Sequence, residues 1–156
     1  MNIAVVGTGY VGLVTGTCFA ETGNHVICVD IDKEKVQKMK DGKVPIYDPH
    51  LDVLFERNIR QGRLLFTTDL KSAIDKAQII FLALPTPPGE DGSADLKYVL
   101  GVAHELGKIM TDYKVIVDKS TVPVGTAEKV HAAVAKHAKV EFDIVSNPEF
   151  LREGFA

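Results

Sequence analysis

A glycine-rich turn near the amino terminus constrains the fold of this chain more than any other feature. Residues 7–12 read GTGYVG, directly after the apolar run Ile3–Val6 and at the start of the small-residue stretch Val11–Glu21. A G-x-G-x-x-G pattern carries little information alone, but between a strand and a helix it is typical of a dinucleotide-binding βαβ unit. The amides at the start of such a helix point toward an anion.

The three glycines and one acidic residue have separate expected roles. Gly7 permits the tight turn, Gly9 lets the backbone approach a diphosphate, and Gly12 lets the helix pack closely on the strand. Asp30 ends the next apolar run, His25–Asp30, where an acidic side chain accepts hydrogen bonds from ribose hydroxyls. Its charge repels a 2′-phosphate, so the pattern favours NAD over NADP. The alternative, a glycine turn and a surface acid without a ligand, explains fewer of these features.

Short apolar runs alternate with amphipathic stretches along the whole chain. This pattern predicts an α/β fold with a doubly wound, mostly parallel sheet of the Rossmann type, six strands in the order 3-2-1-4-5-6, and helices on both faces. Asp69 and Asp95 are expected to cap two of the helices, and the last helix is expected over Val124–His137. The expected strands are Ile3–Val6, His25–Asp30, Leu64–Thr67, Gln78–Leu84, Lys114–Asp118 and Phe142–Val145.

Composition excludes several classes of protein. The chain has 156 residues, of which 46% are hydrophobic and 25% are charged, and its net charge is −3. These values suit one globular domain and not a nucleic-acid binder. No segment is apolar for long enough to span a membrane. Cys18 and Cys28 are expected to be reduced and buried in a cytoplasmic protein, and the five histidines have no metal-ligand spacing.

Three further loops follow the carboxyl ends of predicted strands, the edge at which such sheets bind ligands. Thr86 lies in a proline-rich loop at residues 84–88, and Ser120 and Thr121 lie in the loop at residues 119–125. Residues 146–154 bring Glu149, a candidate general base acting directly or through water, near a strand end. A proline turn, helix capping and a charged helix start are the respective alternatives. The convergence of three such loops on one edge favours a functional site.

Four segments together resemble the N-terminal domain of the UDP-glucose/GDP-mannose dehydrogenase family. They read MNIAVVGTGYVG at residues 1–12, LPTP at 84–87, KSTVPVG at 119–125 and NPEFLREG at 147–154. The resemblance covers essentially the whole chain, and this order of motifs is far more specific than the glycine turn. It implies that residues 1–156 are the NAD-binding N-terminal domain of a longer protein, without its central and C-terminal domains.

The resemblance also implies roles for individual residues. Thr121 and Glu149 match catalytic residues that surround a bound water and transfer protons. The residues expected to contact NAD, with the three glycines, are Tyr10, Val11, Asp30, Lys35, Thr86, Ser120, Thr121 and Glu153. The residues expected to line the nucleotide sugar are Glu149, Phe150, Leu151, Arg152 and Glu153. No metal site is expected.

The family oxidises the C6 alcohol of a nucleotide sugar to a carboxylate in two NAD-dependent steps, through a thioester on a cysteine. That cysteine motif is absent here, so this chain is expected to bind NAD without turning over. UDP-glucose is the expected sugar, with GDP-mannose and UDP-N-acetylmannosamine as alternatives. The full-length protein is expected to be a homodimer or larger. A non-catalytic NAD(H)-sensing module is the alternative of another class, although it leaves the segment at 147–154 without a role.

Overall fold

The computed structural model describes residues 1–90 and 92–154 and contains six strands and six helices in this described part. The strands are β1 (Asn2–Val6), β2 (His25–Val29), β3 (Leu64–Thr67), β4 (Ile79–Leu82), β5 (Lys114–Asp118) and β6 (Phe142–Ser146). The helices are α1 (Tyr10–Glu21), α2 (Lys33–Lys40), α3 (Leu51–Arg60), α4 (Leu70–Lys76), α5 (Lys97–Ile109) and α6 (Thr126–Ala135).

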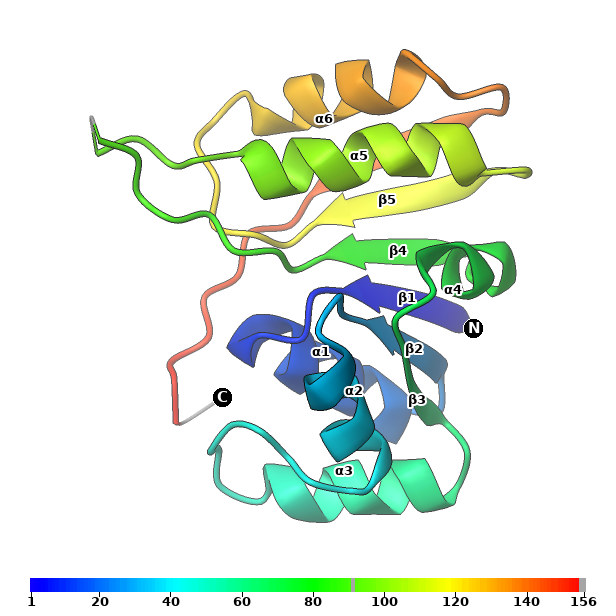
Figure 1. Cartoon of the computed structure of the whole chain (residues 1–156), viewed down its shortest axis with the longest axis vertical. Coiled ribbons are helices and arrows are strands. Elements are labelled where there is room, and N and C mark those ends of the chain that lie inside the picture. Colours follow the sequence, from blue (N-terminus) through cyan, green and yellow to red (C-terminus); the bar gives the residue numbers. More distant parts are fainter. Residues whose placement is uncertain (91, 155–156) are drawn as a thin grey trace.

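The strands form one sheet in the order β3-β2-β1-β4-β5-β6, and every neighbouring pair is parallel. This confirms the predicted doubly wound fold and strand order. Strands β2 and β3 are added on one side of β1, and strands β4, β5 and β6 on the other side. The order of the strands therefore reverses between β1 and β4, where the two halves of the sheet meet (Figure 1). In a sheet of this kind the crevice at the carboxyl ends beside that reversal is the usual ligand site.

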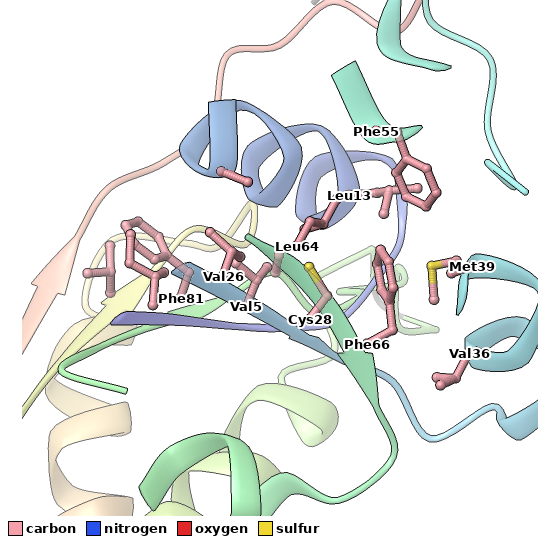
Figure 2. Close-up of a cluster of buried hydrophobic side chains, with 14 residues drawn as sticks. Val5, Leu13, Val26, Cys28, Val36, Met39, Phe55, Leu64, Phe66 and Phe81 are labelled. Atoms are coloured by element: carbon pink, nitrogen blue, oxygen red, sulfur yellow. The ribbon is translucent and has the colours of Figure 1, made fainter. Parts of the chain in front are cut away.

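Two hydrophobic cores cover the two faces of the sheet. Alternation along β1 shows the division, because Ile3 and Val5 belong to one core and Ala4 and Val6 to the other. The first core packs β1, β2 and β3 against α1, α2 and α3, and Figure 2 shows Leu13 and Phe55 above the sheet. The second core packs the opposite face against α4, α5 and α6. The inner strands β2, β1, β4 and β5 are largely buried on both faces, which explains their unbroken apolar runs in the sequence.

Helix and strand ends differ from the predictions by a few residues. Asp69 caps α4 as predicted, because its side chain accepts a hydrogen bond from the Ser72 amide at 3.0 Å. Asp95 accepts a bond from the Lys97 amide at 2.9 Å, but Leu96, not Asp95, occupies the N-cap position of α5. The last helix is shorter than predicted because Gly125 precedes it with a φ of 88°, a left-handed conformation that a helix cannot contain.

The prediction that both cysteines are buried is wrong for Cys18. Cys28 is buried in β2, and burial raises the pKa of its thiol to about 12. Cys18 is exposed on the outer side of α1. Partial burial, and then the charges of Asp48 and Glu21, raise the pKa of the Cys18 thiol. Helix α1 is apolar nearly all round and buries residues 12–17 without a break, so its sequence does not reveal which side faces solvent.

Two glycines of α5 give a test of the packing between α5 and α6. A Cβ at Gly107 would lie closer than 3.0 Å to the carbonyl oxygen of Val134, whereas a Cβ at Gly101 meets nothing within 4 Å. We expect Gly107→Ala to lower the free energy of unfolding by about 1–3 kcal/mol because the helices must separate. Gly101→Ala, the matched control, should raise it by about 0.5–1 kcal/mol through helix propensity. Urea unfolding measures both, and a neutral Gly107→Ala variant would contradict the packing.

Candidate functional site

A cleft of about 680 Å³ opens at the carboxyl edge of the sheet. We call it the carboxyl-edge cleft. The turn between β1 and α1 forms one wall, and the loops after β2, β3, β4 and β5 form the others. Its lining residues include Gly7, Thr8, Gly9, Tyr10, Val11, Asp30, Ile31, Lys35, Thr68, Leu70, Leu84, Thr86, Tyr98, Val102, Lys119, Ser120 and Thr121.

The three glycines of the turn are needed for different reasons. Gly7 has a φ of +100°, and a Cβ there would lie closer than 3.0 Å to the carbonyl oxygen of Ala83. A Cβ at Gly12 would lie equally close to the carbonyl oxygen of Gly7. The fold itself therefore requires Gly7 and Gly12. Gly9 has an ordinary φ of −67°, and a Cβ there meets nothing within 4 Å, so the fold does not require a glycine at that position.

The carboxylate of Asp30 lies against this turn. Its Oδ2 accepts hydrogen bonds from the amide of Thr8 at 3.3 Å and from the Thr8 hydroxyl, and it pairs with Nζ of Lys35 at 3.0 Å. Its Oδ1 accepts a bond from the Asp32 amide at 3.0 Å. Burial works to raise the pKa of Asp30, but these hydrogen bonds and the Lys35 ammonium outweigh it and lower the pKa. Asp30 is therefore ionised at neutral pH, and Lys35 provides the opposite charge beside it.

The loops after β4 and β5 are joined by a serine hydroxyl. Oγ of Ser120 accepts a hydrogen bond from the Leu84 amide at 3.0 Å and donates to the Leu82 carbonyl at 3.2 Å. The Thr86 hydroxyl adds a second link by donating to the carbonyl of Thr121 at 2.8 Å. Ser120 is buried, so its hydroxyl holds the two loops together, whereas Thr121 is exposed at the edge.

Asp118, at the end of β5, is hydrogen-bonded to the same loop. Its Oδ1 accepts a hydrogen bond from the Ser120 amide at 3.2 Å, and its Oδ2 has no hydrogen-bond partner in the described part of the chain. Burial raises the pKa of Asp118, although the bonds from Ser120 work in the opposite direction.

The segment after β6 runs along the same edge of the sheet toward the start of α1 (Figure 1). It begins at Asn147, whose amide donates to the carbonyl of Asp118 at 2.9 Å and whose Oδ1 accepts a bond from Lys119 at 3.2 Å. At its other end the Gly154 amide donates to the Tyr10 hydroxyl at 2.8 Å. Residues 147–154 thus connect the β5 end of the cleft edge to the glycine turn.

Comparison with known proteins identifies the family. Residues 1–156 match the family model described as "UDP-glucose/GDP-mannose dehydrogenase family, NAD binding domain". The chain belongs to this family. The match to its NAD-binding domain makes NAD the cofactor of the fold described above, and this confirms the expected family and cofactor.

Individual members of the family show the extent of the similarity. UDP-glucose 6-dehydrogenase TuaD of Bacillus subtilis is 55% identical over 157 residues, which cover 99% of this chain and 34% of that protein. UDP-glucose 6-dehydrogenase of Pseudomonas aeruginosa is 45% identical over 161 residues, covering 100% of this chain and 36% of that protein. The chain therefore spans about a third of the length of these curated relatives.

Solved structures of the family have the same fold. A UDP-glucose dehydrogenase from Pyrobaculum islandicum superposes with a TM-score of 0.94 at 41% identity, over 99% of this chain and 37% of that one. A ternary complex of GDP-mannose dehydrogenase from Pseudomonas aeruginosa superposes with a TM-score of 0.89 at 35% identity, over 99% and 37% of the two chains.

The predicted site residues of this family member lie in three places. Those that line the cleft are Gly7, Gly9, Tyr10, Val11, Asp30, Lys35, Thr86, Ser120 and Thr121. Gly12 lies buried behind the turn. Residues Glu149, Phe150, Leu151, Arg152 and Glu153 lie on the segment beside the cleft and do not line it. Within the segment, Glu149 accepts a bond from the Leu151 amide at 3.2 Å, and Phe150 is 91% exposed.

Several residues of the site were missed by sequence reasoning. Thr8 occupies a variable position of the glycine pattern, yet it makes two hydrogen bonds to Asp30. Ile31 lines the cleft and is 92% exposed. The available signal was an apolar residue between two acids, Asp30 and Asp32. Leu70, Tyr98 and Val102 add apolar lining from two helices, and only the tertiary structure brings them there.

Neither a metal centre nor a membrane span is found in the described chain. No group of three or more His, Cys, Asp or Glu side chains within residues 1–90 and 92–154 could hold a metal ion. In the same residues, every helix is too short or too polar to cross a membrane.

The charge of Asp30 predicts a pH dependence of stability. Because the folded state lowers the pKa of Asp30, its contribution is complete above the unfolded-state value of about 3.9 and is lost as the pH falls through the folded-state value. Asp30→Asn removes the charge at every pH. We expect the variant to be about 1–2 kcal/mol less stable at pH 7, and this difference to shrink below about pH 4.

Urea unfolding between pH 3 and pH 7 measures the difference between Asp30→Asn and wild type. Glu56→Gln, which removes an exposed carboxylate of α3, is the control and should differ little from wild type at any pH. A difference for Asp30→Asn that stays constant over the whole range would contradict the charged state of this carboxylate.

Proposed function

We propose that this chain is the cofactor-binding part of an NAD-dependent dehydrogenase that oxidises UDP-glucose to UDP-glucuronate. The observation that carries the proposal is Gly9, where the fold does not need a glycine and where the space beside the backbone is open at the start of α1. Helix amides at this position lack intrahelical partners and bind anions such as a diphosphate. The charged Asp30 beside them suits the hydroxyls of an adenosine ribose.

In this proposal, different residues of the cleft bind different parts of NAD. The turn at residues 7–11 holds the diphosphate, and Asp30 accepts the ribose hydroxyls while Lys35 keeps that carboxylate in place. Thr86, Ser120 and Thr121 shape the opposite wall, with Ser120 acting through the position of its loop. When bound, NAD would accept a hydride, which is a proton with two electrons, from the sugar carbon. Glu153 approaches the cofactor from the segment beside the cleft.

Residues of the segment act on the substrate side in this proposal. The residues that line the nucleotide sugar are Glu149, Phe150, Leu151, Arg152 and Glu153. Thr121 and Glu149 flank a water and carry the proton that leaves the sugar C6 hydroxyl, which is general base catalysis. Glu149 projects from a loop that Asn147 and Lys119 tie to the β5 loop bearing Thr121.

The proposal places residues 1–156 as the N-terminal domain of a longer protein whose central and C-terminal domains supply the thioester cysteine. Neither thiol of this chain suits that role, because the pKa values of Cys18 and Cys28 are both raised and a thiolate is the reactive form. We further propose that the whole protein is cytoplasmic and forms a homodimer or a larger assembly.

GDP-mannose is the second candidate sugar. The fold similarity to GDP-mannose dehydrogenase, with a TM-score of 0.89 at 35% identity, supports it. UDP-glucose is favoured because the relatives that are 55% and 45% identical are both named UDP-glucose 6-dehydrogenases.

Substitution of the second and third glycines tests cofactor binding. Gly9→Ala should leave the free energy of unfolding within about 0.5 kcal/mol of wild type, since its Cβ meets no protein atom within 4 Å. It should nevertheless weaken NAD binding by about tenfold or more, because the methyl group occupies the path of the diphosphate. Gly12→Ala is the contrasting variant and should lose stability instead, by about 1–3 kcal/mol.

Calorimetric titration with NAD and thermal unfolding separate the two effects. If Gly9→Ala binds NAD as tightly as wild type does, the proposal that the diphosphate lies at this turn is contradicted.

Glu149→Gln tests the proton-transfer role in the full-length protein. An amide keeps the size of the side chain but accepts no proton, so turnover should fall by about 100-fold or more. The NAD dissociation constant should stay within about twofold, because Glu149 does not line the cleft. Steady-state kinetics and calorimetry measure the two quantities. Turnover equal to that of wild type would exclude Glu149 from the chemistry.

A further inference from the structure

The side chain of Tyr10 joins three parts of the chain that are far apart in sequence. Its hydroxyl donates to the carboxylate of Asp48, in the loop between α2 and α3, and it lies 3.3 Å from the carbonyl oxygen of Arg152. It accepts a hydrogen bond from the Gly154 amide at 2.8 Å. A phenol has one proton to donate and can also accept, so the bonds to Asp48 and Gly154 use both capacities at once.

The glycine turn does not need a tyrosine at this position. Residue 10 is a variable position of the G-x-G-x-x-G pattern, whose backbone amides and not its side chains bind the anion. The hydroxyl of Tyr10 therefore has a task other than holding the diphosphate. Its partner Asp48 is only 8% exposed. A hydrogen bond to a buried carboxylate is stronger than a bond between two neutral groups.

The position of Tyr10 connects two places that have different proposed roles. Tyr10 lines the carboxyl-edge cleft next to Gly9, and its hydroxyl contacts the far end of the segment at residues 149–154. The near end of that segment is held separately, through Asn147 to Asp118 and Lys119. The segment is thus fixed at one end by the sheet and at the other by the residue that opens α1.

We propose that Tyr10 is a positioning residue that couples cofactor binding to the placement of the segment at residues 149–154. The inference rests on the proposed function, since it assigns the cleft to NAD and the segment to the nucleotide sugar. A ligand that orders the turn at Gly9 and Val11 also orders Tyr10, and Tyr10 then holds Gly154 in place. By linkage, a ligand that seats the segment strengthens NAD binding by the same factor.

Tyr10→Phe tests this coupling, because it keeps the aromatic ring and removes only the hydroxyl. The readout is hydrogen exchange at the amide of Gly154, followed by NMR with and without NAD. We expect this amide to exchange about tenfold faster in Tyr10→Phe than in wild type without NAD. Saturating NAD should slow exchange of the amide in wild type and leave it unchanged in the variant.

Tyr113→Phe is the matched control. The Tyr113 hydroxyl also donates to a carboxylate, that of Asp143 at 2.6 Å, but from the loop before β5 and without contact to the segment. In Tyr113→Phe, the hydrogen-exchange rate of the Gly154 amide and the effect of NAD on that rate should equal those of wild type. Asp48→Asn supplies a second test if Tyr10→Phe does not fold, and it should accelerate exchange in the same direction because it weakens the anchor of the hydroxyl.

The outcomes separate this inference from the proposed function. If wild type binds NAD but Gly154 is protected equally in wild type and Tyr10→Phe, the coupling through Tyr10 is wrong and the cofactor assignment stands. If wild type does not bind NAD, the cofactor assignment is wrong. An unchanged Gly154 exchange rate in both Tyr10→Phe and Asp48→Asn without NAD would overturn the contact itself.

Discussion

The hydrogen bonds from Thr8 to Asp30 join the two parts of the candidate site that lie on different strands. Thr8 belongs to the turn after β1, and Asp30 follows the end of β2, so the amide and the hydroxyl of Thr8 fix the carboxylate beside the glycine turn. Lys35 neutralises part of that charge from the first turn of α2 and keeps the side chain ionised. In the proposed function, the turn could still bind the diphosphate without this arrangement, but no carboxylate would be held in place for the ribose hydroxyls.

Much of the fold could be predicted because it depends on local pattern. The strands are short apolar runs, and the inner strands β2, β1, β4 and β5 are largely buried on both faces. Their order is the usual one for a doubly wound dinucleotide-binding sheet. Asp69 capped its helix as predicted, since capping involves residues only three apart. The exposed side of α1 could not be predicted, because a helix of small apolar residues has no polar stripe to mark it, and Cys18 was misplaced for that reason.

The candidate site divides in the same way. Gly7, Gly9 and Asp30 could be identified because their roles depend on strand, turn and helix in sequence order. The contacts of Tyr10 could not, because its partners lie 38 and 144 residues away. Ser120 shows a different difficulty, since a hydroxyl after a strand can face a ligand or the protein, and here it binds the neighbouring loop. Side-chain direction is set by packing that spacing alone does not specify.

The preference between two dinucleotides tests the central claim about the turn and its carboxylate most directly. Titration of this chain with NAD and with NADP, by calorimetry at one fixed ionic strength, compares ligands that differ only at the adenosine 2′ position. The structure predicts NAD binding about tenfold or more tighter than NADP binding, because the ionised Asp30 accepts the 2′-hydroxyl and repels a 2′-phosphate. Equal affinities, or tighter binding of NADP, would contradict the assignment of Asp30 and with it this account of the cleft.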